Sequence, residues 1–214
     1  MNVMKSFSEW LSLNEGLNYP CIVVDVQPEY CKDNPRSFIS APESICERII
    51  NFVAKQTGPV LMFVNAEDTG LTYDTAYEIK QYWEDILGYY PDWNRFQIVD
   101  KGYGYLRSWM DNGIPDNIII ATIRELYRQK QDSTENLQFK DKNLTPIEIA
   151  IKQTIEDMRG DPITVYWTSI AQLKKFNGAY IMGGGRNECL REVELLMNAF
   201  NIKYKRIDSL VYGK

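Results

Sequence analysis

The sequence predicts an α/β fold, a doubly wound and mainly parallel sheet with helices on both faces, and three observations support this prediction. Continuous runs rich in β-branched residues occur at 20–26 and 59–65, as is typical of strands buried on both faces of a parallel sheet. Segments with helical periodicity alternate with these runs, as in βαβ units. The late part of the chain then repeats the same alternation.

The elements follow in order along the chain. After the strand over 20–26, a helix is predicted from Pro42, with Ser40 or Ala41 near its cap and Pro42 and Glu43 in its first turn, where proline is well tolerated. Its periodicity continues to Ala54. The remaining segments of the alternating pattern are a strand at 59–65, a helix at 73–87, a strand at 96–100, a strand at 178–183, a helix at 187–200 and a strand at 202–207.

A different pattern lies between these halves. Two helices are predicted at 115–130 and 146–158, and the second begins with a capping box made by Thr145 and Glu148 around Pro146. A strand over 162–167 and a short helix to 175 follow. We therefore expect one α/β domain over 17–214, with a helical insertion or lid at about 112–161, and a leader or helix at 1–16.

Charge and composition restrict the class of function. The 214 residues include 24 Lys and Arg against 29 Asp and Glu, which gives a net charge of −5. This balance argues against binding to long nucleic acid or to an anionic membrane surface. The chain has no histidine, which excludes Ser-His-Asp and Cys-His catalysis and histidine-based zinc sites. Carboxylate, lysine, cysteine or tyrosine must carry any proton transfer.

The cysteines predict a reduced, cytoplasmic protein. Cys21, Cys31, Cys46 and Cys189 are widely spaced without a CxxC pair, so we expect neither a disulfide framework nor a structural zinc site. Cys21 and Cys46 fit buried positions in a strand and a helix, as small apolar side chains. No stretch approaches the ~20 consecutive apolar residues of a membrane span.

The candidate chemistry gathers after the predicted strands, because ligands of open α/β sheets bind beyond the carboxyl ends of the strands. Cys189 would begin a helix after a glycine-rich strand end. There the helix dipole and free amides stabilise a thiolate, and the amides can serve as an oxyanion hole. Asp25 can accept the thiol proton, and Lys101 can stabilise the thiolate and a developing oxyanion.

This ordered set resembles the isochorismatase-like cysteine hydrolases. The matching segments are Val23-Val24-Asp25-Val26-Gln27, Lys101-Gly102-Tyr103-Gly104-Tyr105, Trp167-Thr168-Ser169-Ile170-Ala171-Gln172-Leu173 and Gly183-x-x-Arg186-x-x-Cys189. The resemblance implies a Cys nucleophile with Asp and Lys, acting on the amide, urea or vinyl ether of a small molecule, and a homo-oligomer. Arg186 replaces the family's Thr. The metal-bound subtype uses histidines, so we expect no metal or other cofactor.

Further residues are candidates for substrate binding. Planar substrates could stack on aromatic side chains in this region, although core packing is the alternative for each. Arg186 could hold a substrate carboxylate or phosphate, or pair with Glu188 or Asp25. The complete set of predicted substrate-binding residues is Gln27, Tyr103, Tyr105, Trp167, Gly184, Gly185 and Arg186.

Two other functions stay open. Asp25, Asp68 and Asp100 all follow predicted strands, so they could together bind Mg²⁺ for phosphoryl transfer or nucleolytic cleavage. The chain has no P-loop or GxGxxG motif after its first strand. The second alternative is not an enzyme: an inactive hydrolase fold that serves in binding or assembly.

The first residues resemble a different kind of protein segment. Residues 4–16 form an amphipathic stretch similar to the leader of internal head proteins of large tailed phages, and Leu13-Asn14-Glu15 is similar to their Leu-x-Glu processing signal. This resemblance implies a phage-encoded, virion-associated protein. An N-terminal helix that packs Phe7, Trp10 and Leu11 on the domain is the alternative.

Overall fold

The computed structural model describes residues 18–31, 43–64, 73–101, 103–104, 106–140 and 143–213. The predicted leader at 1–16, Asp68 and Tyr105 lie outside these residues. The chain divides into two compact units. The sheet unit comprises Met1–Asp100, Phe176–Leu190 and Tyr204–Lys214, and the helical unit comprises Lys101–Lys175 and Arg191–Lys203.

A five-stranded sheet forms the sheet unit, and all its paired strands run parallel. The strand order is β3-β2-β1-β6-β7. The strands are β1 (Cys21–Val24), β2 (Val60–Val64), β3 (Phe96–Asp100), β6 (Ala179–Gly183) and β7 (Tyr204–Val211). Strand β3 has its predicted bounds, whereas β7 continues beyond the predicted end at residue 207 and brings the C-terminal residues to the sheet.

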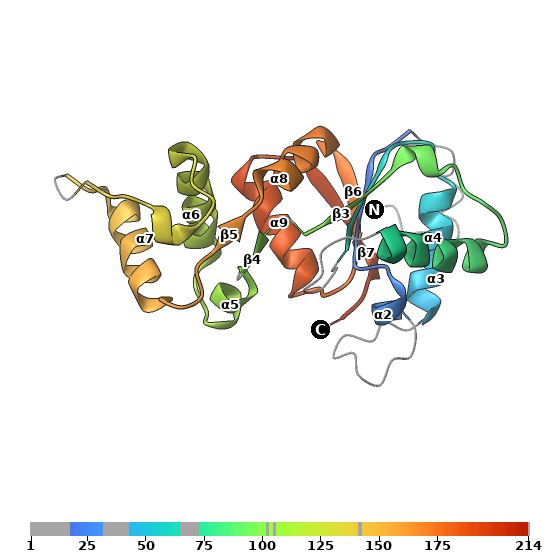
Figure 1. Ribbon diagram of the computed structural model, residues 1–214, viewed down its shortest axis with the longest axis horizontal. Coiled ribbons are helices and arrows are strands. Elements are labelled where there is room, and N and C mark those ends of the chain that lie inside the picture. The colour runs from blue at the N-terminus through green and yellow to red at the C-terminus, as the bar shows by residue number, and fades with distance from the viewer. Residues whose placement is uncertain are drawn as a thin grey trace, which may run out of the picture. The chain divides into compact units, whose positions relative to one another are not determined.

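Helices cover this sheet and close its core. The helical segments that begin in the sheet unit are α2 (Pro28–Cys31), α3 (Glu43–Ala54), α4 (Tyr73–Leu87), the 3-10 turn η2 (Trp93–Arg95) and α9 (Cys189–Ala199), which continues into the helical unit. Helix α3 contacts α4, β6 and β7 (Figure 1). Every residue of β1, β2 and β6 is buried. Because successive side chains of a strand point to opposite faces, both faces of the sheet are covered, and the predicted doubly wound α/β class is confirmed.

Alternate residues of the strands face a core beneath α3 and α4. Phe52 and Trp83 are fully buried there, packed with strand residues such as Met62. The Trp83 indole Nε1 donates to the Val26 carbonyl at 3.1 Å, so its one polar group is satisfied within the core. This bond also holds the chain directly after β1, where the candidate site begins.

Two of the four cysteines are oxidised, whereas the sequence predicted that all would be reduced. Cys31 at the end of α2 and Cys46 in α3 form a disulfide and are both fully buried, so the expectation of four reduced cysteines is wrong for these two. Cys46 is buried as predicted, but its partner could not be identified from spacing, because pairing depends on Cα atoms that approach within about 4.4–6.8 Å in the fold. Their Cα atoms are 5.9 Å apart.

The helical unit contains mainly short elements. They are β4 (Tyr103–Gly104), α5 (Leu106–Asp111), α6 (Asp116–Gln129), the 3-10 turn η3 (Thr134–Asn136), α7 (Pro146–Asp157), β5 (Thr164–Val165), α8 (Trp167–Leu173) and the 3-10 turn η4 (Lys174–Phe176), which ends in the sheet unit. The strand predicted at 162–167 is confined to β5. It pairs antiparallel with β4 in a separate sheet, and Trp167 begins a helix instead. The expected insertion at about 112–161 is the middle part of this unit.

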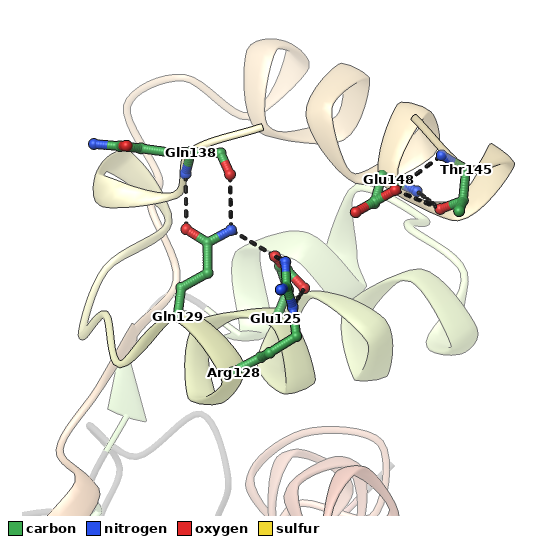
Figure 2. Close-up of polar contacts among 6 residues, drawn as sticks. All are labelled: Glu125, Arg128, Gln129, Gln138, Thr145 and Glu148. Atoms are coloured by element: carbon green, nitrogen blue, oxygen red, sulfur yellow. Dashed lines mark hydrogen bonds and ion pairs between the residues drawn. The ribbon is translucent and has the colours of Figure 1, made fainter. Parts of the chain in front are cut away.

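Polar contacts organise α6 and α7 (Figure 2). The Gln129 side chain donates to the Gln138 carbonyl at 2.8 Å and accepts from the Gln138 amide at 3.0 Å, which holds the polar stretch after α6 against that helix. Arg128 and Gln129 also bind the Glu125 carboxylate, and the hydrogen bond with Arg128 holds the pKa of that carboxyl below its usual value. Among the described residues, no helix has the length and apolar character to cross a membrane.

Candidate active site

The sheet topology defines where a ligand site is expected. Strand β1 pairs with β2 on one side and with β6 on the other, and the chain builds β2 and β3 first before it returns to β6 and β7. The order of strands therefore reverses beside β1. Ligands of open α/β sheets bind at such a point, beyond the carboxyl ends of the strands. Asp25 follows β1 there, and Gly184 follows β6.

Asp25 turns the chain out of β1 in a defined conformation. Its φ is 56°, in the left-handed region that Asp tolerates better than most residues but that still costs roughly 1 kcal/mol. Its amide donates to the Phe63 carbonyl at 2.9 Å, and its carbonyl accepts from the Tyr212 hydroxyl at 2.6 Å. Asp25 is only 2% exposed. The backbone at Asp25 is thus held from both sides.

The glycines after β6 allow two close approaches. A Cβ atom on Gly183, whose φ is 119°, would lie 2.1 Å from the Val24 carbonyl oxygen. A Cβ atom on Gly184 would lie 2.1 Å from the Tyr212 ring. The Gly184 amide donates to the Val24 carbonyl at 2.9 Å. Glycine is required here by backbone and ring contacts, and these contacts bring the turn after β6 against the end of β1.

Cys189 is the first residue of α9, directly after this turn. The Leu190 amide donates to the carbonyls of Gly184 and Gly185, both at 3.0 Å, and the Glu188 amide donates to Gly185 at 2.9 Å. The turn therefore leads directly into the helix. Cys189 is partly exposed and is not part of a disulfide, a position in which the helix N-terminus favours the thiolate.

Tyr212 joins the two strand ends, and sequence reasoning did not identify it. Its amide donates to the Gly183 carbonyl at 3.1 Å, and its carbonyl accepts from the Arg186 amide at 3.0 Å. Burial raises the pKa of the Tyr212 hydroxyl well above its usual value, and the charges of Asp25 and Cys189 raise it further. Asp25 and Cys189 therefore act on the same buried hydroxyl. The apolar pair before it, Leu210 and Val211, was the available signal that the last strand extends this far.

Two other predicted binding residues lie close to these in the chain. Gln27 is 1% exposed, and its side-chain amide donates to the Glu29 carboxylate at 2.9 Å. Arg186 is partly exposed. Its backbone amide donates to the Tyr212 carbonyl at 3.0 Å, so Arg186 lies in the turn that joins β6 to α9.

The remaining predicted residues belong to the helical unit. Lys101 follows β3, is partly exposed, and is the first residue of that unit. Tyr103 lies in β4, opposite Val165. Trp167 donates from Nε1 to the Gln131 carbonyl at 3.0 Å.

Trp167 also takes part in an aromatic cluster. Its ring meets Tyr127 edge to face at 5.4 Å between centroids and Phe200 at 6.2 Å. Lys174 lies over Tyr127 and Phe200, at 4.0 Å and 4.4 Å from the ring centroids. Trp167 therefore packs in an aromatic cluster at the surface of the helical unit, where Tyr127 is 52% exposed.

The three aspartates proposed to bind Mg²⁺ do not all follow neighbouring strands. Asp25 follows β1 and Asp100 ends β3, and β2 lies between these two strands. Asp68 is outside the described residues. Within the part of the chain that the structure describes, no group of three or more His, Cys, Asp or Glu side chains is arranged to hold a metal ion.

The fold and this site define a doubly wound α/β protein with a carboxylate and a thiol at the switch point of its sheet. No protein-family model, no curated protein and no solved structure matches the chain.

Proposed function

We propose that this protein is a metal-independent hydrolase of small molecules in which Cys189 is the nucleophile and Asp25 the base, as in the isochorismatase-like cysteine hydrolases that its sequence resembles. One observation carries the proposal. Asp25 and the turn that leads to Cys189 follow neighbouring strands at the switch point, and Tyr212 is hydrogen-bonded to both segments.

The chemistry can be written for an amide substrate. Asp25 accepts the Cys189 thiol proton, and the thiolate attacks the carbonyl carbon while backbone amides at the start of α9 bind the oxyanion. The C–N bond breaks, and Asp25 returns the proton to the departing amine. Water then attacks the thioester, loses a proton to Asp25 and releases the acid and the thiolate, which recovers that proton.

The role of Lys101 and the metal-independent mechanism are inferred from the sequence. The lysine motif of the resemblance assigns Lys101 to stabilise the thiolate and the oxyanion. The metal-bound members of the family use histidines, and this chain has none. The substrate-binding role of Arg186 belongs to the same proposal, because a guanidinium beside a helix N-terminus suits a carboxylate or phosphate.

The cysteine inventory permits a direct test with iodoacetamide on the native protein. Cys21 is fully buried, and burial raises its pKa to about 12, while Cys31 and Cys46 are joined in a disulfide. Peptide mapping should therefore find the label at Cys189 alone. We expect its labelling midpoint well below pH 8, and Lys101→Ala should move that midpoint upward, whereas Lys140→Ala, a change at an exposed lysine, should not.

The outcomes separate the competing functions. A Cys189 midpoint near the ordinary thiol value of about 8.5 would contradict the proposal. In a screen of small amides and ureas for released amine, Cys189→Ala and Asp25→Asn should each abolish turnover. Asn is the appropriate replacement because it also tolerates the left-handed backbone of residue 25. Activity that requires Mg²⁺ and survives Cys189→Ala would favour the carboxylate hypothesis instead.

A further inference from the structure

We propose that Tyr212 is a positioning residue that holds the Asp25 carboxyl beside Cys189 by tying together the ends of β1 and β6. This inference rests on the proposed function and adds a residue that the family resemblance does not supply. Tyr212 lies 187 residues from Asp25 in the sequence, so only the folded chain brings the two together.

Tyr212 binds both strand ends. Its hydroxyl donates to the Asp25 carbonyl at 2.6 Å, on the side of the base. Its backbone exchanges hydrogen bonds with Gly183 and Arg186, at 3.1 Å and 3.0 Å, on the side of the nucleophile. Together with the hydrogen bond from Gly184 to Val24, Tyr212 therefore fixes the distance between the segments that carry Asp25 and Cys189.

The Tyr212 ring occupies the space that Gly184 leaves by having no side chain. The ring lies against Gly184, where a Cβ atom would come within 2.2 Å of the Tyr212 hydroxyl oxygen and of ring carbons. The residue is 2% exposed. A buried ring in such close contact has one orientation, so its hydroxyl is aimed at the Asp25 carbonyl.

The backbone of Asp25 has an unfavourable conformation that its neighbours stabilise. Its positive φ of 56° is less favourable than an extended conformation for a residue other than glycine. Its neighbours must therefore maintain it, and the two backbone hydrogen bonds described for this residue come from Tyr212 and Phe63. Without the hydroxyl, Asp25 can relax toward the extended region, which would turn its carboxyl away from the site.

The hydroxyl acts as a permanent donor and not as a catalytic acid. Burial and the neighbouring charges keep its pKa well above 10, so it stays protonated throughout the range in which thiols titrate. A neutral hydroxyl adds no charge near Cys189, so its proposed effect on Cys189 acts through the position of Asp25, which gives the inference a specific test.

The test compares Asp25→Asn, Tyr212→Phe and the double variant by the pH profile of iodoacetamide labelling at Cys189. Removing the Asp25 charge should lower the labelling midpoint, since a nearby like charge raises a thiol pKa. We expect a shift of half a pH unit or more, equal to about threefold in rate below the midpoint. Tyr212→Phe keeps the ring and should shift the midpoint in the same direction, and the double variant should shift no further than Asp25→Asn alone.

Tyr180→Phe is the matched control, because Tyr180 is a buried tyrosine of β6 whose ring contacts Tyr19 and Phe52 instead of the turn before Cys189. It should leave the profile unchanged. A Tyr212→Phe profile equal to wild type, or a shift that adds fully to that of Asp25→Asn, would overturn the positioning role and leave the proposed function standing. If Asp25→Asn itself has no effect on the profile, the Asp25–Cys189 pair is refuted and both proposals fall.

Discussion

At the scale of single residues, the packing of the chain after β6 depends on Gly184 having no side chain. Gly184 does not need an unusual backbone conformation, because its φ lies outside the left-handed region. It is required because the Tyr212 ring occupies the position of a Cβ atom. Gly113 is the opposite case, with a φ of +73° and no atom within 4 Å of a Cβ position.

This contrast gives a prediction for Gly184→Ala. The added methyl group must displace a buried ring or the turn, and overpacking of this kind costs roughly 1–3 kcal/mol or more in the free energy of unfolding. Gly113→Ala should cost about 1 kcal/mol from its backbone conformation alone. Urea unfolding followed by tyrosine near-UV circular dichroism compares the two variants. Equal destabilisation would contradict the steric role of Tyr212.

At the scale of elements, local signals predicted most of the regular structure. Helix α4 and strand β3 have their predicted bounds, because apolar periodicity and flanking polar residues are both local in sequence. Strand β5 is one exception, since its segment has strand character but pairs with the short β4 and, through Thr164, with Ser133. Periodicity specifies that a segment is extended, and it does not specify which strand becomes its neighbour.

The capping box of α7 was predicted from the sequence and is confirmed (Figure 2). The Thr145 hydroxyl accepts from the Glu148 amide at 3.4 Å, and the Glu148 carboxylate accepts from the Thr145 amide at 2.8 Å. These backbone and side-chain bonds lower the pKa of Glu148. The box satisfies two amides that have no partner within the helix.

Thr145→Ala should therefore destabilise α7 by about 1 kcal/mol. The change removes the hydroxyl that caps the helix, and Thr145→Ser, which keeps a hydroxyl, should lose only a small part of that energy. Amide hydrogen exchange in the first turn of α7 is the measurement. Equal exchange rates in the Ala variant and the wild type would show that the box does not stabilise the helix.

At the scale of the whole molecule, the chain crosses between its two units repeatedly. The helical unit takes Lys101–Lys175 and then Arg191–Lys203, while the sheet unit closes with Tyr204–Lys214. A single insertion at 112–161 was the simplest prediction from hydrophobic patterns. The actual division depends on which residues pack together, and α9 itself belongs to both units.

The buried thiol and phenol of the sheet unit predict lower stability in alkali. Burial raises the pKa of Cys21 to about 12 and that of Tyr212 well above 10. In the unfolded chain both groups lose their protons at lower pH, so above about pH 9 the unfolded state binds fewer protons and the free energy of unfolding falls. Each group can contribute up to about 1.4 kcal/mol per pH unit.

Urea unfolding between pH 8 and 10.5 measures this slope. Cys21→Ala removes one titrating group and should make the decline with pH shallower than in the wild type. Tyr90→Phe changes a phenol that is 82% exposed and serves as the control. An identical slope in the wild type and the Cys21→Ala variant would refute the contribution of the buried thiol.

The sequence by itself determined the α/β class, most elements, the capping box and the exclusion of histidine chemistry, because each depends on composition or on residues close together in the chain. It also directed attention to Asp25 and Cys189, since both follow predicted strands. Only the tertiary structure decided the strand order, the Cys31–Cys46 disulfide and the contact of Tyr212 with Asp25. The physical reason is that hydrophobic periodicity is a property of neighbours in sequence, whereas hydrogen bonds and disulfides require two groups to meet in space.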